Sequence, residues 1–291
     1  RSLNLSIDLQ LDLFDKMIKP ILLYGCEVWG YCNTNLIERV QLKFLKSIFN
    51  LKQSTPNVMV YGEFGVFPIK VDIQSRMIAY WTKIISDESA LKFSSLLYKI
   101  VFNSASNKTS KWLEYVKGVM INCGFSGVWD AQGTESPKWF VQSIKQKARD
   151  LYINEWYSTI SKSSSCVNYR LFKDIFNIEN YLLKLPFNLK RSLCLFRTRN
   201  HRLPIETGKW LNIDIADRKC HLCNASLGDE FHYLLCCEKL ALERRRYIKT
   251  YYYRRPNTIK FNQLMNITNI SELKKLCKFV KIILNSSNFS N

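Results

Sequence analysis

Four cysteines and two histidines crowd into one short stretch of the chain. It reads Cys220-His-Leu-Cys223, followed by His232 and the adjacent pair Cys236 and Cys237. Zinc binds four tetrahedral ligands drawn from thiolate sulfur and imidazole nitrogen. A Cys-x2-Cys turn directs two thiolates at one ion, because its short loop cannot separate them. The spacing therefore predicts a zinc site built from three cysteines and one histidine.

The second half of this site has to come from the segment around His232. Residues 230–239 are predicted to start a helix or a tight turn, so His232 and Cys236 or Cys237 share a face one turn apart. Four protein ligands leave no position for an activated water, which indicates one structural zinc ion. Reduced core thiols beside a surface histidine are the alternative, but such crowding has no packing reason.

Basic residues are in large excess over acidic ones. The chain has 43 Lys and Arg against 24 Asp and Glu, a net charge of +19, which favours a polyanionic partner, nucleic acid before a membrane surface. Guanidinium groups pair with phosphates and tyrosine rings stack on unpaired bases. The predicted nucleic-acid contacts are Arg197, Arg199, Arg202, Lys219, Arg244, Arg245, Arg246, Lys249, Tyr251, Arg254 and Arg255. Two alternatives stay open: the lysine stripe of residues 274–281 is predicted to be a solvated face, and Trp210 either stacks on a ligand or packs on the site.

Composition and motifs narrow the class of protein. Hydrophobic residues make up 47% and charged residues 23%, which is typical of a globular chain. The longest apolar run, residues 21–26, is too short to span a membrane. Neither a phosphate loop nor a nucleophile elbow is found, so no catalytic activity is predicted for this chain. The scattered cysteines are predicted to be reduced residues of the core: Cys26, Cys32, Cys123, Cys166, Cys194 and Cys277. Reduced thiols are typical of an intracellular protein, and the predicted location is nuclear and cytoplasmic.

Apolar residues recur at spacings of three and four along most of the chain, which predicts a mainly α fold, a multi-helix bundle. The longest predicted helix covers residues 137–160, and Gly124 is expected to end the helix of residues 111–121. Polar loops place boundaries near residues 105 and 165. They delimit a helical region (1–105), a helical connector (106–165) and a basic C-terminal region (166–291) that holds the zinc-binding module at about 210–250.

Two stretches resemble the reverse transcriptases of non-LTR (LINE-type) retrotransposons. Pro20-Ile-Leu-Leu-Tyr-Gly25-Cys-Glu-Val-Trp29-Gly and Tyr61-Gly-Glu-Phe-Gly65 are similar to the segment after the polymerase palm. The cysteine–histidine stretch, with Gly228-Asp-Glu-Phe-His232, resembles the zinc-binding module near the C-terminus of these polyproteins. In that family the last ligand follows the histidine by five residues, which favours Cys237. The resemblance covers residues 18–86 and 190–285.

The resemblance implies a fragment rather than a whole enzyme. The family's polymerase holds two magnesium ions on paired aspartates, and this chain has no Asp-Asp pair. Its first residue is Arg1, which fits a C-terminal piece with a thumb-like region over 1–105. The implied partners are RNA or DNA and an upstream polymerase domain. The alternative is a zinc-stabilised protein-interaction module of a decayed or repurposed retroelement gene.

Overall fold

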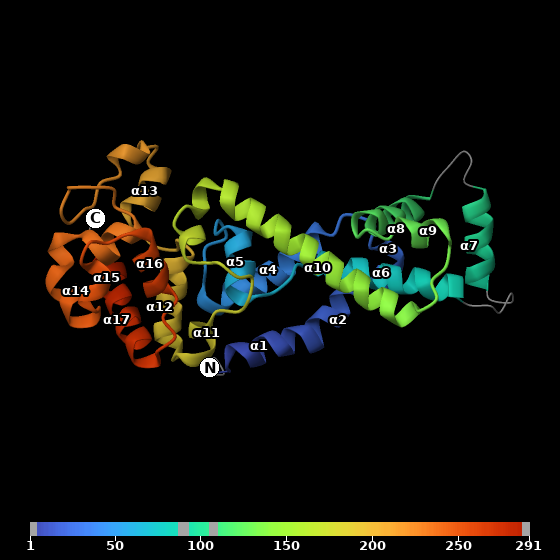
Figure 1. The fold of residues 1–291 in the computed structure, drawn as a ribbon, viewed down its shortest axis with the longest axis horizontal. Helices are drawn as coiled ribbons and strands as arrows, with labels where there is room; N and C mark the ends of the chain where they lie inside the picture. Colours follow the sequence, from blue (N-terminus) through green and yellow to red (C-terminus); the bar gives the residue numbers. More distant parts are fainter. Residues whose placement is uncertain (1–4, 87–92, 105–109, 287–291) are drawn as a thin grey trace. The chain divides into compact units, whose positions relative to one another are not determined.

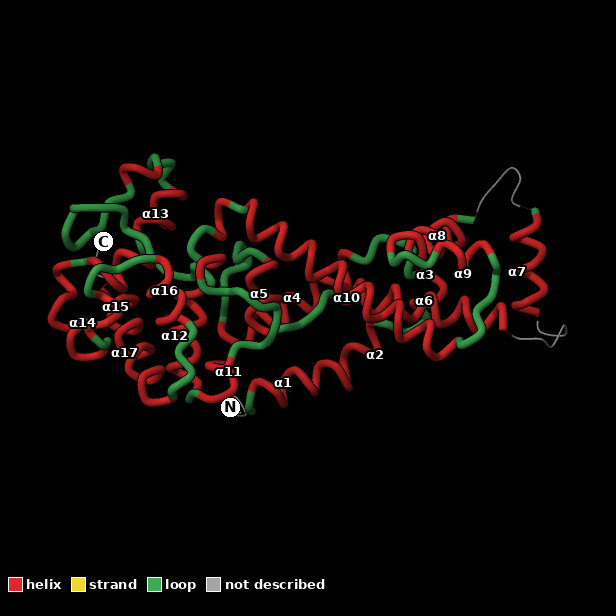
Figure 2. Tube along the Cα trace, viewed as in Figure 1, coloured by secondary structure: helices red, strands yellow, loops and turns green. Residues whose placement is uncertain are grey.

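The computed structural model describes residues 5–86, 93–104 and 110–286. Within these ranges the fold is mainly α, as predicted, with 17 α-helices, short 3-10 and π segments, and no β-strand (Figure 2). The extended backbone forms only isolated bridges there, between Phe64 and Ile178 and between Lys219 and Leu227. None of the described helices combines the length and the apolar composition that a membrane crossing requires.

The chain divides into two compact units, each made of two separate stretches. Unit 1 contains Arg1–Gln41 and Phe67–Tyr157, and unit 2 contains Leu42–Val66 and Ser158–Asn291. The predicted boundaries near 105 and 165 cut the chain elsewhere. The reason is that residues 42–66 and most of the region 106–165 pack by their apolar faces with stretches that are distant in sequence.

Unit 1 contains several short helices of four to seven residues together with longer ones. The division from unit 2 falls within two helices, α4 (Asn35–Phe49) and α10 (Pro137–Lys162). The other elements of unit 1 are α1 (Ile7–Leu13), η1 (Phe14–Ile18), α2 (Lys19–Leu22), α3 (Cys26–Trp29), α6 (Ile69–Ser86), α7 (Phe93–Asn103), α8 (Lys111–Asn122) and α9 (Ser126–Asp130).

The core of unit 1 forms around α6. Met77 and Trp81 are fully buried and share one cluster with Val116 of α8 and Phe140 of α10. Helix α3 approaches α6 closely at Gly30, where an added Cβ would lie 2.4 Å from the Ile73 side chain. Only glycine permits this approach without a shift of α6.

Local helix signals hold well in unit 1. Helix α10 spans Pro137–Lys162, two residues longer than predicted. Helix α8 ends at Asn122, and Gly124 follows with a φ of 81°, the left-handed conformation that favours glycine after a helix. Both signals act within a few residues of the boundary.

Unit 2 has shorter helices and more connections. Its elements besides the end of α4 are α5 (Asn57–Phe64), η2 (Ser164–Cys166), η3 (Tyr169–Leu171), α11 (Asn180–Lys184), α12 (Phe187–Arg197), α13 (Pro204–Trp210), η4 (Ile215–Asp217), η5 (His232–Cys236), η6 (Glu238–Leu240), α14 (Ala241–Tyr247), α15 (Thr250–Tyr253), α16 (Thr258–Met265) and α17 (Ile270–Ser286). Helices α12 and α17 lie side by side (Figure 1). They bury Leu193 and Phe196 on α12 and Leu276 and Val280 on α17.

All ten cysteines are free thiols. Five of the six scattered ones are buried, as expected of core residues. The prediction is wrong for Cys32, which is exposed because it follows the short α3 in a surface turn.

Candidate metal centre

A tight backbone turn carries the first two cysteines. The amide of Cys220 donates to the carbonyl of Ser226 at 2.8 Å, and the amide of Asn224 donates to the carbonyl of Cys220 at 2.9 Å. Asn224 closes the turn with a φ of 57°, which asparagine tolerates better than most residues. The turn is therefore fixed by its own backbone hydrogen bonds.

A π-helical turn carries the other two residues. The amide of Cys237 donates to the carbonyl of His232 at 2.8 Å, five residues back. The Asp229 carboxylate accepts a hydrogen bond of 2.8 Å from the His232 amide and fixes the start of the turn. An i to i+5 hydrogen bond makes a wider turn than an α-helix. It places His232 and Cys237, rather than Cys236, on the same side.

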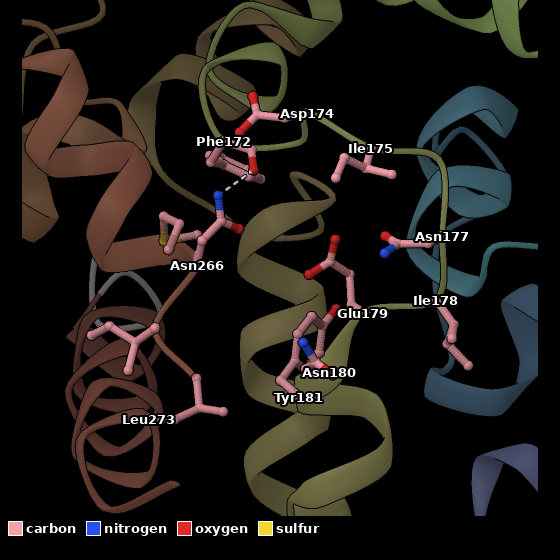
Figure 3. Close-up of a pocket in the computed structure, with 12 residues that line it drawn as sticks. Phe172, Asp174, Ile175, Asn177, Ile178, Glu179, Asn180, Tyr181, Asn266 and Leu273 are labelled. Carbon is pink, nitrogen blue, oxygen red and sulfur yellow. Dashed lines mark hydrogen bonds between the residues drawn. The ribbon is translucent and has the colours of Figure 1, made fainter. Parts of the chain in front are cut away.

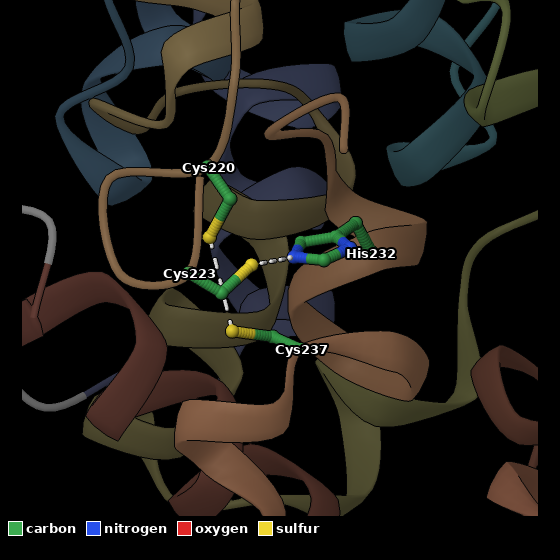
Figure 4. A group of neighbouring side chains, drawn as sticks. All are labelled: Cys220, Cys223, His232 and Cys237. Atoms are coloured by element: carbon green, nitrogen blue, oxygen red, sulfur yellow. Dashed lines mark hydrogen bonds between the residues drawn. The ribbon is translucent and has the colours of Figure 1, made fainter. Parts of the chain in front are cut away.

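The four predicted side chains meet at one point (Figure 4). One sulfur or nitrogen atom from each of Cys220, Cys223, His232 and Cys237 lies within 4.8 Å of the others. The Cys220 and Cys237 sulfurs are 3.8 Å apart, and the Cys223 sulfur is 3.3 Å from His232 Nε2. Two sulfurs on a tetrahedral zinc ion are separated by about 3.8 Å, and a sulfur and a nitrogen by about 3.6 Å. The geometry is compatible with a metal site.

The thiols interact strongly with one another. Burial opposes ionisation of Cys220, but hydrogen bonds from Tyr233 and from backbone amides outweigh it and lower the pKa of this thiol. Burial and then the charge of Cys220 raise the pKa of Cys237 to about 12. Adjacent thiolates can all be ionised together only when a cation lies between them. The donor set therefore suits a metal ion.

Ser226 orients the histidine. Its hydroxyl lies 2.6 Å from His232 Nδ1, so Nε2 is the nitrogen that faces the cysteines. Hydrogen bonds of this kind fix the tautomer of a metal-binding imidazole. Sequence reasoning missed Ser226, because a serine between cysteines and histidine has no distinctive spacing.

Arg244 stabilises the π turn through hydrogen bonds to its backbone. Its side chain is buried and donates to the carbonyls of Leu234 and Cys237, both at 2.8 Å, and of Tyr233 at 3.3 Å. The predicted nucleic-acid contact of Arg244 is thus corrected: its guanidinium satisfies carbonyls that the turn leaves without donors.

Arg197 is also buried. Its Nε lies 3.1 and 3.0 Å from the two oxygens of Glu63, and its Nη2 lies 3.2 Å from Glu179. These carboxylates outweigh the burial penalty and raise the pKa of Arg197. The predicted nucleic-acid contact of Arg197 is corrected for this reason, since a fully buried guanidinium cannot reach a phosphate.

Arg199 is mostly committed inside the protein. It pairs with Glu206 and Glu230 and donates to the carbonyl of Ser165 at 2.8 Å. Glu230 in turn lies 2.8 Å from His201 Nε2. Burial opposes the charge of Glu230, but His201 and Arg199 outweigh it and lower the pKa of this carboxyl to about 2.

The remaining predicted contacts are exposed: Arg202, Lys219, Arg245, Arg246, Lys249, Tyr251, Arg254 and Arg255. Three of them, Arg245, Arg246 and Lys249, line a hollow together with Lys275 and Tyr252, termed the basic hollow below. Lys275 belongs to the stripe that was predicted to be only a solvated face. The single carboxylate of the hollow, Glu272, pairs with Lys249 at 2.6 Å.

A second hollow of unit 2 has the opposite character (Figure 3). Its lining contains Asp174, Glu179, asparagines and apolar side chains, with no Lys or Arg. Glu179 is already paired with Lys173 at 2.5 Å and with Arg197. This hollow presents no cationic side chain, in contrast to the basic hollow.

Comparison with protein-family models, with curated proteins and with solved structures finds no match for this chain.

Proposed function

We propose that unit 2 binds nucleic acid through its exposed basic residues, on a scaffold that one structural zinc ion stabilises. The basic hollow carries this proposal. Four cationic side chains converge there and one carboxylate opposes them. Phosphate groups are the anions that such convergent arginines and lysines bind best, and Tyr252 provides an aromatic face beside them.

Zinc is the metal that the donor set favours. Three thiolates and one imidazole are soft ligands, which select zinc over magnesium or calcium. Cys220, Cys223, His232 and Cys237 would bind the ion, and Ser226 and Arg244 would keep the two turns in place. The ion would crosslink the segment of residues 220–237.

The resemblance to LINE-type reverse transcriptases supports the same function. On that basis the chain is a thumb and zinc-binding tail that grips template RNA or target DNA, without an active site of its own. Its partner in the full-length protein would be an upstream polymerase domain, in an intracellular compartment that keeps the thiols reduced.

Anisotropy of a fluorescein-labelled RNA, titrated at several salt concentrations, tests the proposal. The double variant R245A/R246A should weaken binding about tenfold and lower the magnitude of the logarithmic salt slope by about 2. The matched control K274A/K278A removes two exposed charges of α17 outside the hollow and should change affinity less than about twofold. Binding that is indifferent to salt, or equal losses in both double variants, would contradict the proposal.

A protein-interaction module is the second candidate. The segment after α13 exposes Leu211, Ile213 and Ile215, with 69%, 38% and 60% of their surface accessible. An apolar run of this kind is typical of a protein-binding surface. If unit 2 binds only proteins, the wild-type chain should bind neither RNA nor DNA in the salt titration.

A further inference from the structure

A cleft of unit 2 contains an exposed tryptophan. Trp210 ends α13 and is 55% exposed, and Lys52 Nζ lies 4.1 Å from the centre of its ring. The residues of this cleft, termed the Trp210 cleft, that carry the argument are Lys52, Thr55, Asn200, Glu206, Lys209 and Trp210. It is separate from the basic hollow and shares no residue with it.

One amide side chain joins the two walls of the cleft. The Oδ1 atom of Asn200 accepts hydrogen bonds from the Lys52 amide at 2.8 Å and from the Thr55 hydroxyl at 3.0 Å. Asn200 is itself held by Thr198, whose carbonyl and hydroxyl accept from Nδ2 at 3.1 and 3.0 Å. The segment of residues 52–55 is therefore fixed against the end of α12, and the cleft exists before any ligand arrives.

The charges of the cleft favour an anion. Lys52 and Lys209 are exposed, while the one carboxylate, Glu206, is already paired with Arg199. Partial burial lowers the pKa of Lys52; Glu206 opposes this shift, and the positive charge of Arg202 adds to it. Cations crowded in this way gain from an anion placed between them.

The residues that line the cleft also indicate the shape of the ligand. Lys52 lies over the indole, yet more than half of Trp210 is exposed, which leaves ring surface for a second flat group. Ser54 and Thr55, which are small and polar, also line the cleft. The exposed aliphatic residues Leu211, Ile213 and Ile215 do not line the cleft. A polar, flat anion fits this lining better than an apolar protein segment.

We infer that the Trp210 cleft holds one nucleotide of a single strand, with its base stacked on the indole and its phosphate at the ammonium groups of Lys52 and Lys209. This inference rests on the proposed nucleic-acid function. The strand has to be unpaired, because bases within a duplex are stacked on one another and do not present a free face. Discrimination of single strands from duplexes would thus come from this cleft, and general affinity from the basic hollow.

The experiment measures anisotropy of fluorescein-labelled oligouridylate and of an RNA duplex of the same length, with the whole chain. W210A should weaken oligouridylate binding about tenfold, the usual value of one stacked base, and change duplex binding less than about twofold. W210Y should recover most of the loss. The matched control is W139A, which removes a tryptophan that is 62% exposed in unit 1 and should change neither affinity.

A second variant protects the test from a folding artefact. K52A removes the ammonium group but keeps the backbone amide that binds Asn200, and it should weaken oligouridylate binding about fivefold with unchanged metal content. Unchanged oligouridylate binding in W210A, or an equal loss of affinity for the single strand and the duplex, would contradict a nucleotide site in the Trp210 cleft. So would an equal loss of oligouridylate binding in L211A/I215A, since the apolar run would then be the contact.

The outcomes also separate the two proposals. If R245A/R246A weakens RNA binding and W210A does not, the proposed nucleic-acid function is supported and the inferred nucleotide site in the Trp210 cleft is wrong. If the wild-type chain binds neither probe in a salt-dependent way, both proposals fail.

Discussion

Within the described residues, the polar side chains that unit 1 buries are all uncharged, whereas unit 2 buries seven charged ones. Those of unit 1 are Gln41, Ser75, Thr82 and Ser95. Those of unit 2 are Lys46, Glu63, Lys173, Lys190, Arg197, Glu230 and Arg244. Burial of a charge is unfavourable unless partners satisfy it. The two units therefore depend on different interactions for their stability.

The buried cations of unit 2 donate hydrogen bonds to backbone carbonyls. Lys46 donates to the carbonyls of Gln53 and Thr55 at 2.8 and 2.9 Å, and Lys190 donates to the carbonyl of Leu182 at 2.5 Å. The carbonyls of Gln53 and Thr55 lie in the connection between α4 and α5, and that of Leu182 lies in the last turn of α11, where a helix leaves its carbonyls without a helical donor. Part of the positive charge of the chain thus serves the interior and is no measure of a binding surface.

The largest expected difference between the units concerns the metal. C220S should remove the ion and lower the free energy of unfolding of unit 2 by about 5 kcal/mol or more, because metal binding and folding of such segments are coupled. Metal content by mass spectrometry and urea unfolding measure both effects. The matched control C236S removes the neighbouring thiol that lies outside the cluster and should keep one ion per chain. Retention of the ion by C220S would contradict the site.

Removal of a buried charge should distinguish the units next. R197M leaves Glu63 buried without its partner and should cost about 3–5 kcal/mol of unfolding free energy. In unit 1, T82V removes a buried hydroxyl that bonds to the Ile78 carbonyl of its own helix, and should cost less than about 1 kcal/mol. Urea unfolding of both variants provides the measurement.

The double variant E63Q/R197M sharpens this result. It removes both charges, so part of the lost stability should return. If R197M and T82V cost the same, or if the second substitution adds to the loss, the buried ion pair does not account for the difference between the units.

Two neighbouring arginines of α14 test which charges serve the interior. R244A removes the donor to three carbonyls of the π turn and should cost about 2–3 kcal/mol. R245A removes an exposed side chain and should stay within about 0.5 kcal/mol while it weakens RNA binding. Thermal unfolding and RNA anisotropy separate the two effects; the reverse pattern would refute the assignment of Arg244.

The smallest expected effect concerns Ser226. S226A removes the hydroxyl that orients His232 and should lower metal affinity about tenfold, without loss of the fold. Competition with a chromogenic chelator measures it, and S271A, an exposed serine at the start of α17, is the control. Equal affinity in S226A and the wild type would show that the imidazole needs no such support.

Local signals were sufficient for the helical class of the fold, for the bounds of α8 and α10 and for the cysteine–histidine cluster. Gly124, Pro137 and the Cys-x2-Cys turn act within a few residues, so sequence reasoning could place them. The burial of Arg197 depends on its ion pair with Glu63, which is 134 residues away in the sequence, and no local sequence pattern predicts that contact. The Trp210 cleft was likewise beyond prediction, because Lys52 and Trp210 come together only in the folded unit.

The wide turn between His232 and Cys237 has a consequence for sequence change. In an α-helix a residue five positions on points about 140° away, and only the π register brings this pair together. Substitutions among the four intervening residues preserve that register, whereas loss or gain of a single codon rotates one donor away from the others. Natural variants of this segment should accordingly differ in composition while its length stays constant.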